Sequence, residues 1–272
     1  MSRFSGLETA DILSSQGKFK AASEALLEAA KFTDNILKKG SITLSAVGAL
    51  VAAGEYELAK KELEHVKVLM ATCLETGANP NQDDMVRIAI GIKFEEVNLI
   101  SLAGRAEEAT KGYAALLEEY ETSLKHPRFH DLRDAIVGER AFLLVDLGVI
   151  EQTLPTLEKL EPGQSDNAVL LFYLGYCYVV VKEYRKARTK LKFALALGLP
   201  PHLNFRAHCS LGIAYYFEAD YANAKTELEI GAKTASERYL KEARIWKWLE
   251  GSCTGLGQTI EAERYRKLSR SS

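Results

Sequence analysis

The chain has 272 residues, 47% of them hydrophobic, and a formal net charge of −2 at pH 7. That apolar content is ample for a buried core, and the longest apolar run, residues 169–181, is too short to span a membrane. The first residues lack the pattern of a secretory signal and the four cysteines form no CxxC pair, so we expect a cytoplasmic protein with reduced thiols.

Helices are predicted along the whole chain. Apolar residues recur three or four positions apart in the long segments, as in residues 26–30 and 58–66, and alternation typical of strands is hard to find. With only six prolines in the chain, the sequence predicts an all-α fold.

A short pattern recurs seven times at intervals of 34 to 50 positions, which indicates stacked structural repeats. Each copy has a small or turn-forming residue, here called the hinge residue, followed five positions later by alanine in six of the seven copies. An apolar residue usually stands four positions before the hinge and another nine positions after it. The hinge residues are Gly17, Gly54, Gly104, Gly148, Lys182, Ala219 and Gly257.

Two helices joined by a tight turn explain this pattern. The first helix would end at the hinge, where glycine tolerates a left-handed cap, and alanine would let the second helix approach closely. The predicted pairs form one domain, residues 1–272, and span approximately 4–38, 41–76, 83–125, 131–162, 168–200, 205–238 and 240–270.

The second and third pairs are longer than the others. We expect a helix over about 57–76, the loop Gly77–Gln82, and a helix running to Ala103 that is capped by Asp83 or Asp84. A second break is expected at Pro127, which cannot continue the preceding helix. Drift in helix length explains these departures, and a partner surface is the alternative.

The chain resembles the tetratricopeptide repeat family. The best copy reads Leu171-x-x-Leu174-Gly175-x-x-Tyr178, followed by Tyr184, Ala187, Leu191, Ala194 and Pro200, and the next copy reads Leu211-Gly212-x-x-Tyr215, followed by Tyr221, Ala224 and Leu228. The last copy has Glu250 and Arg266 at positions where the family has small and apolar residues, which suits a solvent-facing end. The resemblance implies a right-handed α-solenoid of about seven repeats whose first helices line a concave groove.

In that geometry the groove of the later repeats would be apolar and aromatic, and would bind a peptide or an amphipathic helix of another protein. Alternatively, individual rings pack against neighbouring repeats as core. Three basic side chains on first helices could meet acidic residues that flank the ligand. The predicted binding residues are Phe142, Phe172, Tyr173, Tyr176, Ile213, Tyr216, Phe217, Trp248, Arg206, Arg244 and Lys247.

A scaffold or adaptor that binds another protein without catalysis is therefore the leading hypothesis. Charge leaves self-association open, because residues 182–272 carry 17 Lys and Arg against 10 Asp and Glu, whereas the remainder carries 18 against 27. A peptide-sensing regulatory protein is the other alternative. Nucleic acid is disfavoured, since the basic residues of 182–192 surround more than one helical face.

No catalytic, metal or cofactor site is predicted. Pro127 interrupts the spacing His126-x-x-x-His130, and the neighbouring side chains of His208 and Cys209 would point about 100° apart on a helix. The glycines of residues 251–257 lack the lysine and strand of a phosphate-binding loop.

Overall fold

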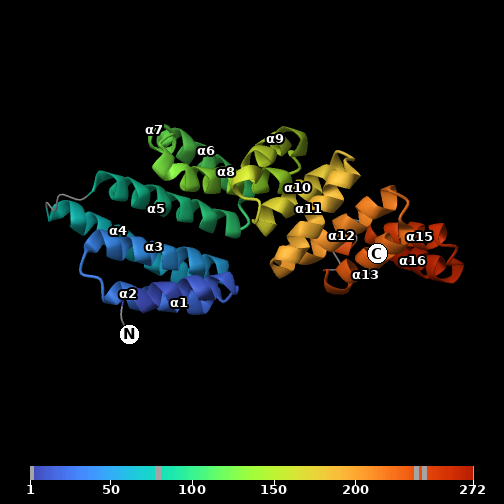
Figure 1. Ribbon diagram of the computed structural model, residues 1–272, viewed down its shortest axis with the longest axis horizontal. Coiled ribbons are helices and arrows are strands. Elements are labelled where there is room, and N and C mark those ends of the chain that lie inside the picture. Colours follow the sequence, from blue (N-terminus) through green and yellow to red (C-terminus); the bar gives the residue numbers. More distant parts are fainter. Residues whose placement is uncertain (1–2, 77–80, 236–238, 241–243, 272) are drawn as a thin grey trace. The chain divides into compact units, whose positions relative to one another are not determined.

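The computed structural model describes residues 3–76, 81–235, 239–240 and 244–271, and every regular element assigned in these residues is helical (Figure 1). Contacts between Cα atoms divide the chain into two compact units, Met1–Leu143 and Leu144–Ser272, and the boundary falls within one helix, α8. The predicted all-α fold is confirmed.

In its described residues the first unit contains seven α-helices and a 3₁₀ turn, and it ends within an eighth helix, α8. Its elements are α1 (Arg3–Ser15), α2 (Phe19–Lys31), α3 (Ile36–Ala52), α4 (Tyr56–Glu75), α5 (Gln82–Leu102), α6 (Ala106–Glu119), α7 (Glu121–Leu124), the turn η1 (Pro127–Phe129) and α8 (His130–Asp146). The second unit continues with α9 (Ile150–Leu160), the 3₁₀ turn η2 (Glu161–Gly163), α10 (Ala168–Val180), α11 (Tyr184–Leu197), α12 (Pro201–Phe217), α13 (Tyr221–Thr234), α15 (Ile245–Gly255) and α16 (Thr259–Ser271).

Each predicted hinge joins two helices, and each has the backbone conformation expected of a left-handed cap. At Gly54, for example, the hinge N–H donates to the carbonyl of Val51 at 3.1 Å, and the N–H of Glu55 donates to the carbonyl of Leu50 at 2.9 Å. This pair of bonds satisfies carbonyls that the end of a helix leaves without partners. The φ angles are 69° at Gly17, 79° at Gly54, 79° at Gly104, 84° at Gly148, 66° at Lys182, 60° at Ala219 and 71° at Gly257.

Small residues at the helix crossings explain why the two helices of a repeat pack closely. A Cβ on Gly175 would lie 2.6 Å from Cγ of Leu191, and a Cβ on Gly212 would lie 2.6 Å from Cγ of Leu228. Six of the seven residues five positions after the hinges are alanines and one is threonine, and all seven are buried.

The last repeat replaces this close contact with an ion pair. Glu250 stands where Gly175 and Gly212 stand in the two preceding repeats, and Arg266 stands in place of the leucine. Arg266 Nε donates to Glu250 at 2.8 Å, and Nη1 of the same residue contacts Glu263 at 2.9 Å. The two polar substitutions therefore compensate each other, and Arg266 is exposed as predicted.

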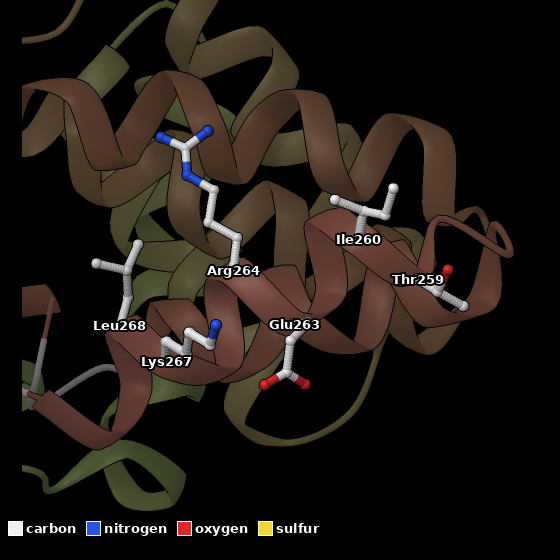
Figure 2. A pocket seen from close by; sticks show the side chains of 6 residues that line it. All are labelled: Thr259, Ile260, Glu263, Arg264, Lys267 and Leu268. Carbon is white, nitrogen blue, oxygen red and sulfur yellow. The ribbon is translucent and has the colours of Figure 1, made fainter.

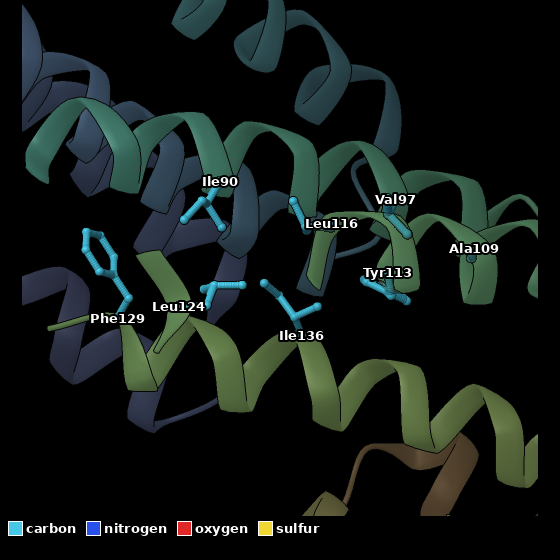
Figure 3. Close-up of a cluster of buried hydrophobic side chains, with 8 residues drawn as sticks. All are labelled: Ile90, Val97, Ala109, Tyr113, Leu116, Leu124, Phe129 and Ile136. Carbon is cyan, nitrogen blue, oxygen red and sulfur yellow. The ribbon is translucent and has the colours of Figure 1, made fainter. Parts of the chain in front are cut away.

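Figure 3 shows one part of the core in the first unit, with its side chains between α5 and α8. Within this core Tyr113 donates a hydrogen bond to Asn98, and Nδ2 of Asn98 donates to Glu95 at 3.0 Å. Burial raises the pKa of the Glu95 carboxyl, and the bond from Asn98 opposes that shift only in part. The cluster comprises Ile90, Val97, Ala109, Tyr113, Leu116, Leu124, Phe129 and Ile136.

The structure corrects one prediction about the lengthened helices. Asn81, not Asp83 or Asp84, caps α5, because its side chain accepts the N–H of Asp83 at 3.1 Å. Of the predicted loop Gly77–Gln82, residues 77–80 lie outside the described part. The predicted break at Pro127 is confirmed, since this residue begins η1 and α8 starts only at His130.

No helix in the described residues combines the length and the apolar character needed to cross a membrane.

Candidate functional site

Five aromatic rings from four helices of the second unit form a continuous array, which we call the aromatic cluster. Phe217 lies at its centre: its ring stacks on Tyr184 with centroids 4.7 Å apart and meets the ring of Trp248 edge-on at 5.3 Å. Tyr216 contacts Trp248 at 5.2 Å, Phe217 at 5.5 Å and Tyr221 at 5.6 Å. The structure therefore brings together three predicted residues, Tyr216, Phe217 and Trp248.

Two glycines of α15 make room for this array. A Cβ on Gly251 would lie 2.7 Å from the ring of Tyr216, and one on Gly255 would lie 2.4 Å from the ring of Tyr221. From the sequence, these glycines suggest only a defective phosphate-binding loop, and Tyr184 and Tyr221 were not among the predicted binding residues. Both tyrosines stand two positions after a hinge residue. This fixed spacing is the sequence signal that would have placed the two tyrosines at the array.

The aromatic cluster is accessible on one side. Phe217 is 49% exposed, and the rings of Tyr184, Tyr216 and Trp248 are half-buried around it. Its neighbours fix the position of this ring, so contact with an apolar side chain costs little ordering of Phe217 itself.

Arg206 of α12 lies over two of the three predicted rings of α10. Its guanidinium lies 5.3 Å from the ring centroid of Phe172 and 5.6 Å from that of Tyr176. Nη2 of Arg206 also donates to Asp146 at 2.8 Å, and the hydroxyl of Tyr173 donates to the other carboxylate oxygen at 2.8 Å. These contacts hold the rings and the charge together as part of the fold.

Burial decides which of the predicted anchors can meet a partner. Phe172 and Tyr173 are buried, so the structure places them in the interior and not on a groove surface, and Tyr176 keeps only a half-buried ring. Phe142, in the first unit, is also buried. Ile213 is half-buried and packs against the core that contains Leu249.

The predicted cations also differ in availability. Arg206 is engaged as described above, whereas Arg244 and Lys247 are exposed at the start of α15. Arg244 caps this helix with a left-handed backbone, at φ 54°.

The basic residues of α11 are largely committed to contacts within the protein. Arg188 pairs with Glu218 at 2.9 Å and lies over the ring of Tyr215, as does Lys192. Lys190 pairs with Glu161. A partner with phosphates would have to compete with these contacts, which weakens the nucleic-acid alternative.

The histidines that sequence spacing singled out have structural contacts. The ring of His126 accepts the N–H of Arg128 at 3.4 Å, and a ring nitrogen of His208 lies 2.7 Å from Glu227. Cys209 is buried, which raises the pKa of its thiol to about 12. Within the described part of the chain, no three His, Cys, Asp or Glu side chains gather in a geometry that could hold a metal ion.

A pocket lies on α16 of the second unit. Figure 2 shows its described lining, which comes from this one helix and combines charged side chains with Ile260 and Leu268. The described lining contains no aromatic ring, so it offers fewer rigid apolar contacts than the aromatic cluster does. The lining residues are Thr259, Ile260, Glu263, Arg264, Lys267 and Leu268.

No family model matches the sequence, and no curated protein matches it either. Comparison with solved structures, by contrast, finds similar folds. The TPR-sensor-containing signal transduction ATPase of the STAND class from Pyrococcus horikoshii matches over 99% of this chain and 42% of its own length, with a TM-score of 0.57 and 14% identity.

Two further structures are similar over most of their own length. A mutant of MamA matches over 68% of this chain and 98% of its own, with a TM-score of 0.52 and 18% identity. BtubC from P. vanneervenii matches over 80% of this chain and 89% of its own, with a TM-score of 0.50 and 15% identity. The chain therefore has the tetratricopeptide-repeat fold, an α-solenoid built from helix pairs.

Proposed function

We propose that this protein is an interaction scaffold without catalytic activity, and that its second unit binds an apolar segment of another protein at the aromatic cluster. The observation that carries the proposal is the exposure of Phe217, at 49%, in the middle of rings that hold it in place. Rigid aromatic side chains at the centre of an interface supply much of the binding energy in known complexes.

The size of the effect follows from the surface that Phe217 leaves open. An aromatic side chain buries about 150–250 Å² when it is fully covered. Covering the remaining half of Phe217, with about 25 cal/mol gained per Å², would contribute roughly 2–3 kcal/mol before losses of entropy. Contacts with the edges of Tyr184 and Trp248 would add to this, and either an extended peptide or an amphipathic helix could make them.

The fold supports this class of function. The signal transduction ATPase that matches the whole chain is described as having a tetratricopeptide-repeat sensor. A sensor must bind what it senses, and a chain with the same fold and an exposed aromatic cluster is suited to a binding role. Self-association, in which a second copy occupies the cluster, is the competing function.

The test compares three forms of the full chain in selections from a display library of random linear peptides. Phe217→Ala removes the central ring, and Phe193→Ala is the matched control, because Phe193 is 60% exposed on α11 of the same unit. We expect the wild type and the control to enrich the same peptides, and Phe217→Ala to bind them at least about tenfold more weakly. Equal binding by all three forms would show that the aromatic cluster is not the binding surface.

A further inference from the structure

We propose that the segment bound at the aromatic cluster carries acidic side chains beside its apolar anchor, and that Lys182 and Lys247 contact them. This inference rests on the proposed function and adds the chemistry of the partner. It follows from the position of these two lysines, from the pairing of the charges around them and from the charge of the surrounding chain.

The two lysines stand close in sequence to rings that contact Phe217, one in α15 and one at a hinge. Lys247 directly precedes Trp248, whose ring lies 5.3 Å from that of Phe217, and it is exposed. Lys182 is the hinge before α11, two positions from Tyr184, whose ring stacks on Phe217 at 4.7 Å, and it is also exposed. Each lysine is therefore an exposed cation within two positions of a ring that contacts Phe217.

Two of the three acidic residues near the aromatic cluster are already paired with cations, and the third, Asp220, is bound to the neutral Asn223. Glu218 accepts a hydrogen bond from Arg188 at 2.9 Å and lies 3.9 Å from Arg185. Glu183 lies 3.7 Å from Lys186. Asp220 caps α13 by accepting the N–H of Asn223.

The two lysines have no such partner. Across the described residues, neither the side chain of Lys182 nor that of Lys247 forms a hydrogen bond or an ion pair. These two lysines, against the one carboxylate of Asp220, leave a net positive charge at the cluster. An acidic side chain of a partner would complete these two sites, whereas a basic one would meet repulsion.

The net positive charge of the C-terminal part of the chain also favours an acidic ligand. Residues 182–272 carry 17 Lys and Arg against 10 Asp and Glu, an excess of seven positive charges. Such an excess attracts acidic segments over distances of about one Debye length, roughly 8–10 Å at moderate salt, and raises their rate of association.

Arg206, which lies on a first helix of this unit, differs from the two lysines because its charge is compensated within the protein. It is bound to Asp146 at 2.8 Å and covered by two rings, so it belongs to the fold. The selectivity for acidic ligands is assigned to Lys182 and Lys247, and not to this arginine.

The experiment uses the same display library and the full chain with two charge variants. Lys247→Glu reverses a charge beside Trp248, and Lys233→Glu makes the same change at the far end of α13, which starts at Tyr221 of the cluster. Lys233 is exposed and lies 12 residues along the helix from Tyr221, which corresponds to about 18 Å. Both variants should keep the circular dichroism spectrum and unfolding midpoint of the wild type, because both side chains are exposed.

We expect the peptides enriched by the wild type to place Asp or Glu next to an aromatic or aliphatic residue. Lys247→Glu should weaken their binding by about threefold to tenfold, with Lys233→Glu close to wild type, and added salt should weaken wild-type binding. A synthetic peptide of the enriched sequence, with Lys in place of its acidic residues, should bind the wild type more weakly than the enriched peptide does. The same Lys-containing peptide should bind Lys247→Glu more tightly than it binds the wild type.

Other outcomes would overturn the inference in distinguishable ways. Peptides that depend on Phe217 but show no acidic preference would remove the charge assignment and leave the proposed function intact. If no peptide depended on Phe217, both would fail. Sedimentation showing a dimer that Lys247→Glu dissociates, without enrichment of any peptide, would assign the surface to a second copy of this chain.

Discussion

The hinge at Ala219 gives the sharpest test of how the repeats are built. Its φ of 60° lies in the left-handed region, where a side chain with a Cβ costs roughly 1–2 kcal/mol. Glycine would relieve that cost, but it also gains about 0.4–1 kcal/mol of freedom in the unfolded chain. Since Ala219 is exposed and loses no packing, Ala219→Gly should stabilise the protein by about 0.5–1 kcal/mol.

The matched control reverses the change at another hinge. Gly54 has φ 79°, and a Cβ built there meets nothing within 4 Å, so Gly54→Ala tests backbone strain without a clash. It should destabilise the protein by about 0.5–1 kcal/mol, because the strain of the left-handed backbone is offset in part by the smaller entropy of alanine in the unfolded chain.

Urea unfolding measures both changes. The only two tryptophans of the chain, Trp246 and Trp248, lie in the second unit and report on Ala219, and circular dichroism reports on the whole chain. A loss of stability in Ala219→Gly would refute the argument, because it would mean that this hinge behaves as an ordinary helical position, where glycine is unfavourable by about 1 kcal/mol.

Two further predictions concern buried positions. Gly212→Ala should destabilise the protein by about 1–3 kcal/mol, because the new Cβ would lie 3.0 Å from the backbone N of Leu228. Gly163→Ala is the control in the same urea titrations, and it should be close to neutral because a Cβ there meets nothing within 4 Å. Glu95→Gln should stabilise the protein by about 1 kcal/mol at pH values above the raised pKa, since burial raises the pKa of this carboxyl and so disfavours its charged form in the folded state. The stability of the wild type should therefore fall as pH rises from the ordinary pKa of a glutamate through the raised pKa of Glu95. This part of the fall should disappear in Glu95→Gln. A pH profile of stability that is the same in both proteins would contradict the raised pKa of Glu95.

The sequence predicted the repeats well because their signal is local. A left-handed hinge, an alanine five positions later and an apolar residue four positions earlier are all fixed by one turn of backbone, and the structure places every hinge in the expected conformation. The prediction of the N-terminal cap of α5 was wrong because several neighbouring residues can serve as caps. Asn81, Asp83 and Asp84 are all good caps within four positions, and only the geometry of the chain shows which one is used.

The site was predicted less well because exposure depends on contacts between repeats. Phe172 and Phe217 both lie on first helices in aromatic stretches of sequence, and nothing local separates them. Arg206 of α12, the first helix of the following repeat, covers Phe172, whereas the contacts around Phe217 leave half of its ring exposed. The exposure of the two rings therefore differs because of a side chain from another repeat. The residues next to Phe172 or Phe217 in the sequence do not predict where that side chain lies.

The central claim, that a ligand binds over the aromatic cluster, can be tested through the emission of Trp248. Trp246 stacks on Tyr265 with centroids 6.1 Å apart, and Trp246→Phe leaves Trp248 as the single tryptophan of the chain. Titration of this variant with a peptide enriched in the display selection should change the emission of Trp248, with saturation at the concentrations that saturate binding. A peptide that binds the variant while the emission of Trp248 stays constant would contradict the claim.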